Sequence, residues 1–262
     1  EELTTNQTDN FTFNVMDDSA DVYNIDTKTF VVNLVGTNDI PVITVETGNS
    51  ASKTLAETNT TLTTNGTLSV VDLDTTQTVS VTKVGVVASN NTNGLISANS
   101  ALLDMLTITQ TPIDGTAQSG TISWAFNSGS EAFNYLASGE TLTLTYTIKA
   151  TDDDSSLSSD TQTVVITIVG TNETPNITVE SGNSASETLI ETDATLTTNG
   201  TLSVKDLDKT DVITTSFVVD SVQRNANNTI MNTDSNEPNN SILASMLTIT
   251  QTPIDGTAQS GT

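Results

Sequence analysis

Carboxylates dominate the side chains of this sequence that could do chemistry. The 262 residues include 32 Asp and Glu against 7 Lys and Arg, with no Cys and no His. Thiolate nucleophiles, Ser–His pairs and zinc sites built from nitrogen or sulfur are therefore excluded. Clustered carboxylates can still bind hard cations through oxygen, above all Ca²⁺, or act as the acid and base of glycoside hydrolysis.

The acidic residues recur in four kinds of set. The sets are single glutamates (Glu57 and Glu191), Asp-Leu-Asp pairs (Asp72 with Asp74, Asp206 with Asp208), acidic runs (Asp17 and Asp18; Asp152, Asp153 and Asp154) and linker pairs (Asn38 with Asp39, Asn172 with Glu173). An Asp-x-Asp pair at a strand end sends both carboxylates to one side. Two charges about 4 Å apart repel by roughly 1 kcal/mol in water and about 4 kcal/mol at an effective dielectric of 20. A bound Ca²⁺ removes that penalty, so we predict that these residues are Ca²⁺ ligands.

The acidic sets also allow two other interpretations. A solvated acidic surface would serve only solubility, and for the run 152–154 this is as well supported as cation binding. Glycoside hydrolysis needs two carboxylates that flank the scissile bond, and tandem copies with no accompanying cleft signature disfavour it. We therefore expect that the protein is not an enzyme.

The formal net charge of −25 restricts the partners of the chain. Nucleic acid is not expected, because affinity for phosphate comes mainly from Lys and Arg. Anionic membrane surfaces are disfavoured for the same reason, and no apolar window is long enough for direct membrane insertion. The first residues lack the basic and apolar regions of a signal peptide, so we expect the chain to be a piece of a longer protein.

Long identical stretches divide the chain into repeats. Residues 61–70 recur unchanged at 195–204, and residues 105–121 recur at 246–262, which gives a period of about 134 residues that lengthens in the second copy. The repeat pattern predicts the end of an upstream repeat at 1–38, one complete repeat at 39–171 and the start of the next repeat at 172–262. Arrays of this kind usually provide reach or stiffness rather than a single chemical site.

The elements that must position the carboxylates are short strands. Apolar residues alternate with Thr or Ser at 42–46, 67–71, 78–84, 106–110, 121–126, 141–149 and 163–170. This alternation is typical of antiparallel sheets with one wetted face. Seven or more such strands per repeat predict an all-β chain of tandem immunoglobulin-like sandwiches arranged end to end.

Two smaller features complete the predicted fold. The segment 99–106 begins with Asn99 as a possible N-cap and has apolar spacing, so we expect one helical turn that plugs an end of the sandwich. The aromatic residues gather in the second half of the complete repeat. They could form a platform for sugars, but with so few aromatics in the chain we expect them to fill the core.

The ordered motifs resemble the VCBS family, the immunoglobulin- and cadherin-like repeats of giant RTX adhesins of Gram-negative bacteria. The matching pieces are Glu57, the segments 66–74, 120–124 and 136–143, Tyr146, the loop 152–154 and the segment 163–172. Two departures stand out. The stretch 84–106 is longer than the usual family loop, which could alter or split the domain, and Glu173 stands where the family linker normally has Asp.

The resemblance implies a secreted protein on the bacterial cell surface, exported by type I secretion, with Ca²⁺ at the junctions between sandwiches. Its repeats would contact their neighbours in the same chain and act as an extender for attachment or biofilm formation. Other parts of the full protein would then contact the host or abiotic surface. An alternative is an adhesin module whose Thr-rich faces or aromatics themselves bind glycans or another surface.

Overall fold

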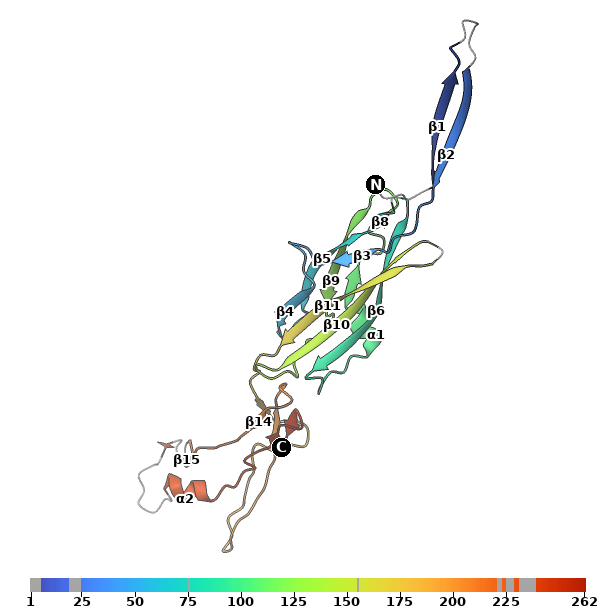
Figure 1. The fold of residues 1–262 in the computed structure, drawn as a ribbon. Coiled ribbons are helices and arrows are strands. Elements are labelled where there is room, and N and C mark those ends of the chain that lie inside the picture. The colour runs from blue at the N-terminus through green and yellow to red at the C-terminus, as the bar shows by residue number, and fades with distance from the viewer. Residues whose placement is uncertain are drawn as a thin grey trace.

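The computed structural model describes residues 6–18, 25–74, 76–154, 156–220, 223–224, 229–230 and 239–262. Three parts follow one another along an elongated molecule: a blue hairpin, a central sandwich and a C-terminal segment in orange and red (Figure 1). The hairpin consists of β1 (Gln7–Met16) and β2 (Ile25–Leu34). Its strands pair antiparallel, with Phe11 opposite Phe30.

The central sandwich consists of two packed sheets. Its strands are β3 (Val42–Thr44), β4 (Ser52–Ala56), β5 (Thr63–Val71), β6 (Thr78–Asn90), β7 (Leu106–Ile108), β8 (Ile113–Asp114), β9 (Ser119–Asn127), β10 (Thr141–Asp152) and β11 (Ser159–Val169). One sheet has the order β3-β5-β9-β7 and the other the order β4-β11-β10-β6-β8. The first strand of the sandwich is split between the sheets as β3 and β4, and β4 pairs parallel with β11. This is an immunoglobulin-like, cadherin-like arrangement, and it confirms the predicted fold class.

The alternation seen in the sequence is what builds the sandwich. Along β10 every second residue is fully buried, from Leu142 to Asp152, while the Thr residues between them lie on the outer face. In the neighbouring strand β11, buried and partly exposed residues alternate in the same way over its second half. Period-two patterning therefore produces one apolar face per sheet, and the two faces meet in the core.

The aromatic side chains fill that core, as predicted. Trp124, Phe126, Phe133, Tyr135 and Tyr146 are at most 5 % exposed. The rings of Phe126 and Tyr146 meet edge to face across the two sheets, with centroids 6.4 Å apart. No sugar platform is formed by these five residues, because their rings are inside.

The helical turn exists as α1 (Asn99–Asp104), but its predicted cap is wrong. The N-cap position is Ala98, and no side chain caps the helix. Leu102 is fully buried in the core, and the hydroxyl of Tyr146 donates to its carbonyl oxygen at 2.9 Å. The helix is therefore held by packing rather than by a cap.

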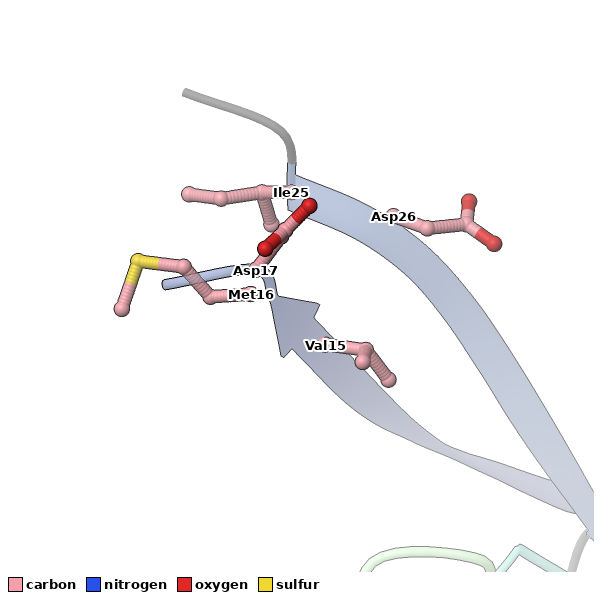
Figure 2. A pocket seen from close by; sticks show the side chains of 5 residues that line it. All are labelled: Val15, Met16, Asp17, Ile25 and Asp26. Carbon is pink, nitrogen blue, oxygen red and sulfur yellow. The ribbon is translucent and has the colours of Figure 1, made fainter. Parts of the chain in front are cut away.

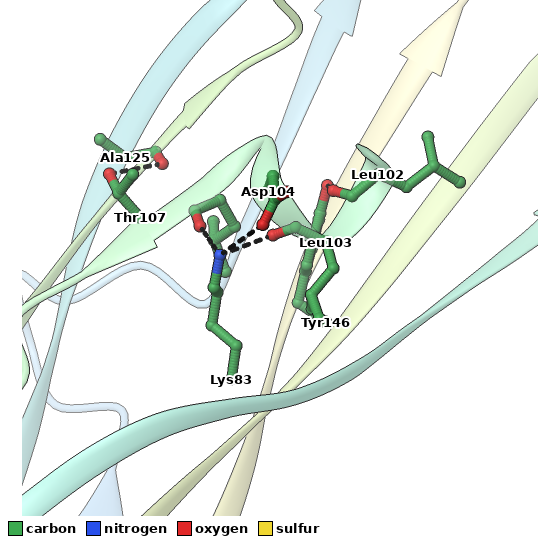
Figure 3. A network of polar contacts seen from close by, with 8 residues as sticks. Lys83, Leu102, Leu103, Asp104, Thr107, Ala125 and Tyr146 are labelled. Atoms are coloured by element: carbon green, nitrogen blue, oxygen red, sulfur yellow. Dashed lines mark hydrogen bonds and ion pairs between the residues drawn. The ribbon is translucent and has the colours of Figure 1, made fainter. Parts of the chain in front are cut away.

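Lys83 donates hydrogen bonds to carbonyl oxygens at the C-terminal end of α1. Its ammonium group donates to the carbonyl oxygens of Leu103 at 2.8 Å and Leu106 at 2.7 Å, and it lies 3.9 Å from a carboxylate oxygen of Asp104 (Figure 3). The long stretch 84–106 thus extends β6, forms α1 and contributes Leu102 and Leu103 to the sandwich. The stretch therefore lies within one sandwich and does not split it.

The C-terminal segment has short strands. They are β12 (Asn176–Thr178), β13 (Ser203–Lys205), β14 (Val212–Ile213), β15 (Gln223–Arg224), β16 (Thr229–Ile230), β17 (Ile254–Asp255) and β18 (Ser260–Gly261), with α2 at Asn240–Ser245. The order β12-β13-β18 follows β3-β5-β9 of the sandwich. In α2 the side chain of Asn239 accepts from the N–H of Ile242, so this helical turn does have a cap.

A substitution at Gly66, which lies close to Trp124, tests the packing of the sandwich core. A Cβ at Gly66 would collide with Cζ2 of Trp124 and lie 2.9 Å from the carbonyl oxygen of Ser50. We expect Gly66→Ala to lower the free energy of unfolding by about 1–3 kcal/mol, measured by urea denaturation. Gly85→Ala is the matched control, since a Cβ at this strand glycine meets nothing within 4 Å. Equal effects of the two substitutions would contradict this packing.

Candidate metal centre

The linker before the sandwich brings Asn38 and Asp39 against the ends of β5 and β10, where Asp72, Asp74 and Asp152 lie. The backbone N–H of Asp39 donates to Oδ2 of Asp74 at 2.7 Å. Nδ2 of Asn38 donates to Oδ2 of Asp152 at 3.1 Å. Oδ1 of Asp72 accepts from the N–H of Asp74 at 3.1 Å. These five residues, from three separate segments, form what we call the first junction.

Three of the four carboxylates of the first junction are buried. Asp72, Asp74 and Asp152 are at most 3 % exposed, and Oδ2 of Asp72 has no hydrogen-bond partner. Burial, and then the charges of Asp74, Asp152 and Asp39, raise the pKa of Asp72 above its usual value. Burial also raises the pKa of Asp152. Both shifts mean that the negative charge is destabilised at this position.

Two neighbours in the run 152–154 have local roles. Asp153 accepts from the N–H and hydroxyl of Thr78 at 3.1 and 2.9 Å, at the start of β6. Asp154 accepts from the N–H and hydroxyl of Ser156, and these bonds hold the pKa of Asp154 below its usual value. The structure therefore separates the buried Asp152 from Asp153, which is bonded to the start of β6, and from Asp154, which is bonded within its own loop.

The acidic run at the hairpin is not brought to the first junction. Asp17 and Asp18 follow the end of β1 and are exposed. Figure 2 shows Asp17 and Asp26 at the end of the hairpin, beside Val15, Met16 and Ile25. The hairpin extends away from the sandwich, so its outer end lies far from the sandwich strands (Figure 1).

The linker after β11 repeats the geometry of the first junction. The N–H of Glu173 donates to Oδ2 of Asp208 at 2.8 Å, and the N–H of Asp208 donates to Oδ1 of Asp206 at 3.0 Å. Nδ2 of Asn172 donates to the carbonyl oxygen of Glu173 at 2.8 Å, as Asn38 does to Asp39 at 2.8 Å. We call this group, with Glu57, the second junction.

Glu57 belongs to the second junction and joins it from the sandwich side. It is 1 % exposed, and its Oε2 accepts from the hydroxyl of Thr171 at 2.8 Å. The same hydroxyl lies 3.5 Å from Oε1 of Glu173. Its sequence counterpart Glu191 is exposed and lies outside both groups.

Like charges crowd the second junction. Burial, then the hydrogen bond with Asp208 and the charge of Glu57, raise the pKa of Glu173 to about 7. Burial also raises the pKa of Asp208. Three buried carboxylate oxygens have no hydrogen-bond partner: Oε2 of Glu173, Oδ2 of Asp206 and Oδ1 of Asp208. An unpaired buried polar group costs roughly 1–3 kcal/mol, and more if it is charged.

Two further residues at the second junction were not predicted. Glu140, before β10, accepts from the hydroxyl of Thr210 in the next unit at 3.0 Å. Burial, followed by the charges of Asp208, Asp206 and Glu140, raises the pKa of Asp211. Asp211 replaces Gln77 of the first copy, so a search for acidic residues at matching places could not find it.

The side chains of the two junctions are of the type that binds cations. Among the described residues the ion pairs join Lys83 with Asp104 and Lys205 with Glu180, so neither junction is neutralised by them. Carboxylate and backbone oxygens are what Ca²⁺ prefers, in flexible geometry. No group of three or more carboxylates in the described ranges is yet arranged to hold a metal ion. Side-chain rotation at a junction would therefore have to accompany binding.

Comparisons with known proteins add the following. No protein-family model matches the chain, and no curated protein matches it in sequence. It is similar to the protocadherin GammaB4 extracellular domain (18 % identity, 78 % of this chain and 29 % of that chain, TM-score 0.33). It is also similar to AggA, the major subunit of aggregative adherence fimbriae type I from Escherichia coli (9 % identity, 51 % and 97 %, TM-score 0.31).

A third similar structure is PapD-like domain 7 of human CEP192 (10 % identity, 60 % of this chain and 96 % of that chain, TM-score 0.33). At these identities and TM-scores we infer nothing about function. The resemblance to VCBS repeats stays a prediction. In the described ranges no helix is long and apolar enough to span a membrane.

The raised pKa of Glu173 predicts a pH dependence in calcium-free buffer. A carboxyl whose pKa is raised from 4.5 to about 7 on folding stabilises the folded state fully below pH 4.5. That contribution is lost as the pH rises through about 7. We expect the melting temperature of the C-terminal segment to fall over this range, measured by circular dichroism.

Glu173→Gln should flatten this pH dependence. Glu180→Gln is the control, because the hydrogen bond with Lys205 lowers the pKa of exposed Glu180 instead. A wild-type melting temperature that is constant or rises between pH 4.5 and pH 7 would show that the junction does not hold its carboxylates under repulsion.

Proposed function

We propose that this chain is a non-catalytic extender of a secreted adhesin on the bacterial cell surface, and that Ca²⁺ at its junctions keeps consecutive sandwiches in line. One observation carries the proposal. At the second junction, buried carboxylate oxygens of Glu173, Asp206 and Asp208 have no partner, and they come from the linker and from the next unit.

A cation at this place would join three bodies. Glu57 belongs to the sandwich, Glu173 to the linker, and Asp206 with Asp208 to the following unit. Each of these four side chains is at most 9 % exposed. Coordination of their oxygens would compensate for the burial and for the neighbouring charges that together raise the pKa of Glu173. A linker that would otherwise bend is then fixed to both neighbours.

The same arrangement at the first junction supports a repeating design. The bond from Asp39 N–H to Asp74 and the bond from Glu173 N–H to Asp208 measure 2.7 and 2.8 Å and connect equivalent positions. Here Asp72, Asp74, Asp152, Asn38 and Asp39 would supply the oxygens. A structure built twice along one chain suits reach and stiffness better than a single recognition site.

Catalysis and glycan recognition are less well supported by the structure. The buried carboxylates serve the linkers between units, and the aromatic side chains that could stack on sugars are inside the sandwich. Adhesion would then be carried by other parts of the full protein, while these repeats contact their neighbours in the same chain.

Calcium-dependent stability tests the proposal. At a hundredfold excess over its dissociation constant, one bound ion stabilises the folded state by about 2.7 kcal/mol, which raises the melting temperature by several degrees. We expect this rise for the wild-type chain in millimolar CaCl₂ relative to EGTA, and no comparable rise with MgCl₂. Differential scanning calorimetry measures it directly.

Asp208→Asn separates cation binding from general stability. The Asn side chain can still accept from the N–H of Glu173, and it removes one buried charge, so the variant should be at least as stable as wild type in EGTA. It should lose most of the response to calcium. Asp193→Asn, at an exposed site of the same segment, should keep the full response. Equal calcium responses in both variants would remove the second junction from the proposal.

A further inference from the structure

The loop 131–140, which leads into β10, is held in place from within the sandwich. Tyr135, in its middle, is 5 % exposed and belongs to the core. The stretch 91–97 after β6 holds the loop from the other side. The hydroxyl of Ser97 donates to Oε2 of Glu131 at 2.6 Å, and the hydroxyl of Tyr135 donates to the carbonyl oxygen of Asn91 at 2.9 Å. The loop is therefore anchored at several points by its own sandwich.

Glu140, the last residue of this loop, is oriented by the same contacts. Its Oε2 accepts from Nδ2 of Asn91 at 2.6 Å and from the N–H of Ala137 at 3.0 Å. Its Oε1 accepts from the hydroxyl of Thr210 in the following unit at 3.0 Å. Both oxygens of Glu140 thus have donors, whereas Glu173, Asp206 and Asp208 each keep an oxygen without a partner. Glu140 needs no cation to satisfy it.

A second bond joins the loop to the same turn of the following unit. The backbone N–H of Lys209 donates to the carbonyl oxygen of Tyr135 at 3.2 Å. Lys209 and Thr210 lie in the turn 208–211, where the N–H of the last residue donates to the carbonyl oxygen of the first at 3.3 Å. The equivalent turn 74–77 of the sandwich is closed in the same way at 3.4 Å. The turn is therefore a feature of each unit and is not created by the contact.

We propose that the loop 131–140, held by the stretch 91–97, is a docking surface for the turn 208–211 of the following unit and sets the rotation of that unit relative to the sandwich. The contact lies at the end of the sandwich that faces the C-terminal segment (Figure 1). Ca²⁺ accepts its ligands in flexible geometry, whereas hydrogen bonds are directional and favour one orientation. The inference does not rest on a bound cation.

The proposal gives the long stretch 84–106 a role outside its own sandwich. Asn91 bonds to Glu140 and Tyr135, the two residues that contact the following unit. Asn91 is therefore a positioning residue. Two hydrogen bonds form a weak contact, so the turn opens and recloses, and it is docked for the largest share of time when the linker is held straight.

Hydrogen exchange of the Lys209 amide, followed by NMR in the full chain, tests the docking. In millimolar CaCl₂ we expect this amide to exchange more slowly than in an unfolded chain, because it donates to the sandwich. Thr210→Val removes the hydroxyl that bonds to Glu140 and should speed the exchange about two- to tenfold. Thr195→Val, at an exposed position of the same segment, is the matched control and should leave the rate unchanged.

Asn91→Ala tests the positioning role, because Asn91 acts on the turn only through the loop. It should also speed the exchange of Lys209. Asn93→Ala, which removes an exposed side chain from the same stretch, should not. The amides of β10 should stay protected in all four variants, which shows that the sandwich is intact. Thr210 lies outside the sandwich, so its variant remains informative if Asn91→Ala disturbs the fold.

Two results would overturn the docking. Exchange of Lys209 at the rate of an unfolded chain in both CaCl₂ and EGTA would mean that the turn does not dock. Equal rates in wild type and Thr210→Val would mean that the bond to Glu140 does not hold it. A melting temperature that ignores calcium, together with a Lys209 amide that is protected and sensitive to Thr210→Val, would refute the proposed function and support the docking.

Discussion

Burial of like charges at the linkers is the constraint on which this structure depends. Folding brings Asp72, Asp74 and Asp152 together at one junction and Glu57, Glu173, Asp206 and Asp208 at the next, all nearly inaccessible to water. Several of their oxygens lack hydrogen-bond partners. Such an arrangement is stable only if the charge is reduced, by protons or by a cation. The pKa of Glu173, raised to about 7, favours protonation, whereas the proposed Ca²⁺ would compensate for the charge without protons.

The sandwich determines where these groups lie. Its strands alternate buried apolar residues with exposed Thr, and the closed core formed by residues such as Trp124 and Tyr146 makes a rigid body. Strand ends then project carboxylates at both poles of that body. Each linker contacts the Asp-Leu-Asp pair that follows it through a backbone N–H group. The N–H of Asp39 donates to Asp74, and the N–H of Glu173 donates to Asp208. A flexible chain of domains becomes stiff if those contacts are held.

The sequence was sufficient for the fold class, and it singled out several residues that the structure brings together at the linkers, while their role as cation ligands stays a prediction. Period-two patterning predicts seven of the nine strands of the sandwich and misses β4 and β8, and the scarcity of aromatics predicts that Trp124 is in the core. The Asp-Leu-Asp pairs and linkers meet because strand ends and connections are adjacent in such a fold. The sequence could not show that Glu57 joins the second junction, that Asp17 stays at the hairpin, or that Glu140 takes part, because these depend on which pole of the sandwich each loop occupies.

The central claim is that a cation holds consecutive units in line, and pulsed electron spin resonance tests it most directly. Nitroxide labels at Thr82→Cys in β6 and Thr198→Cys in the C-terminal segment are both exposed and span the second junction. The account predicts one narrow distance distribution in millimolar CaCl₂ and a broad one in EGTA. Identical distributions in both buffers, whether narrow or broad, would contradict it.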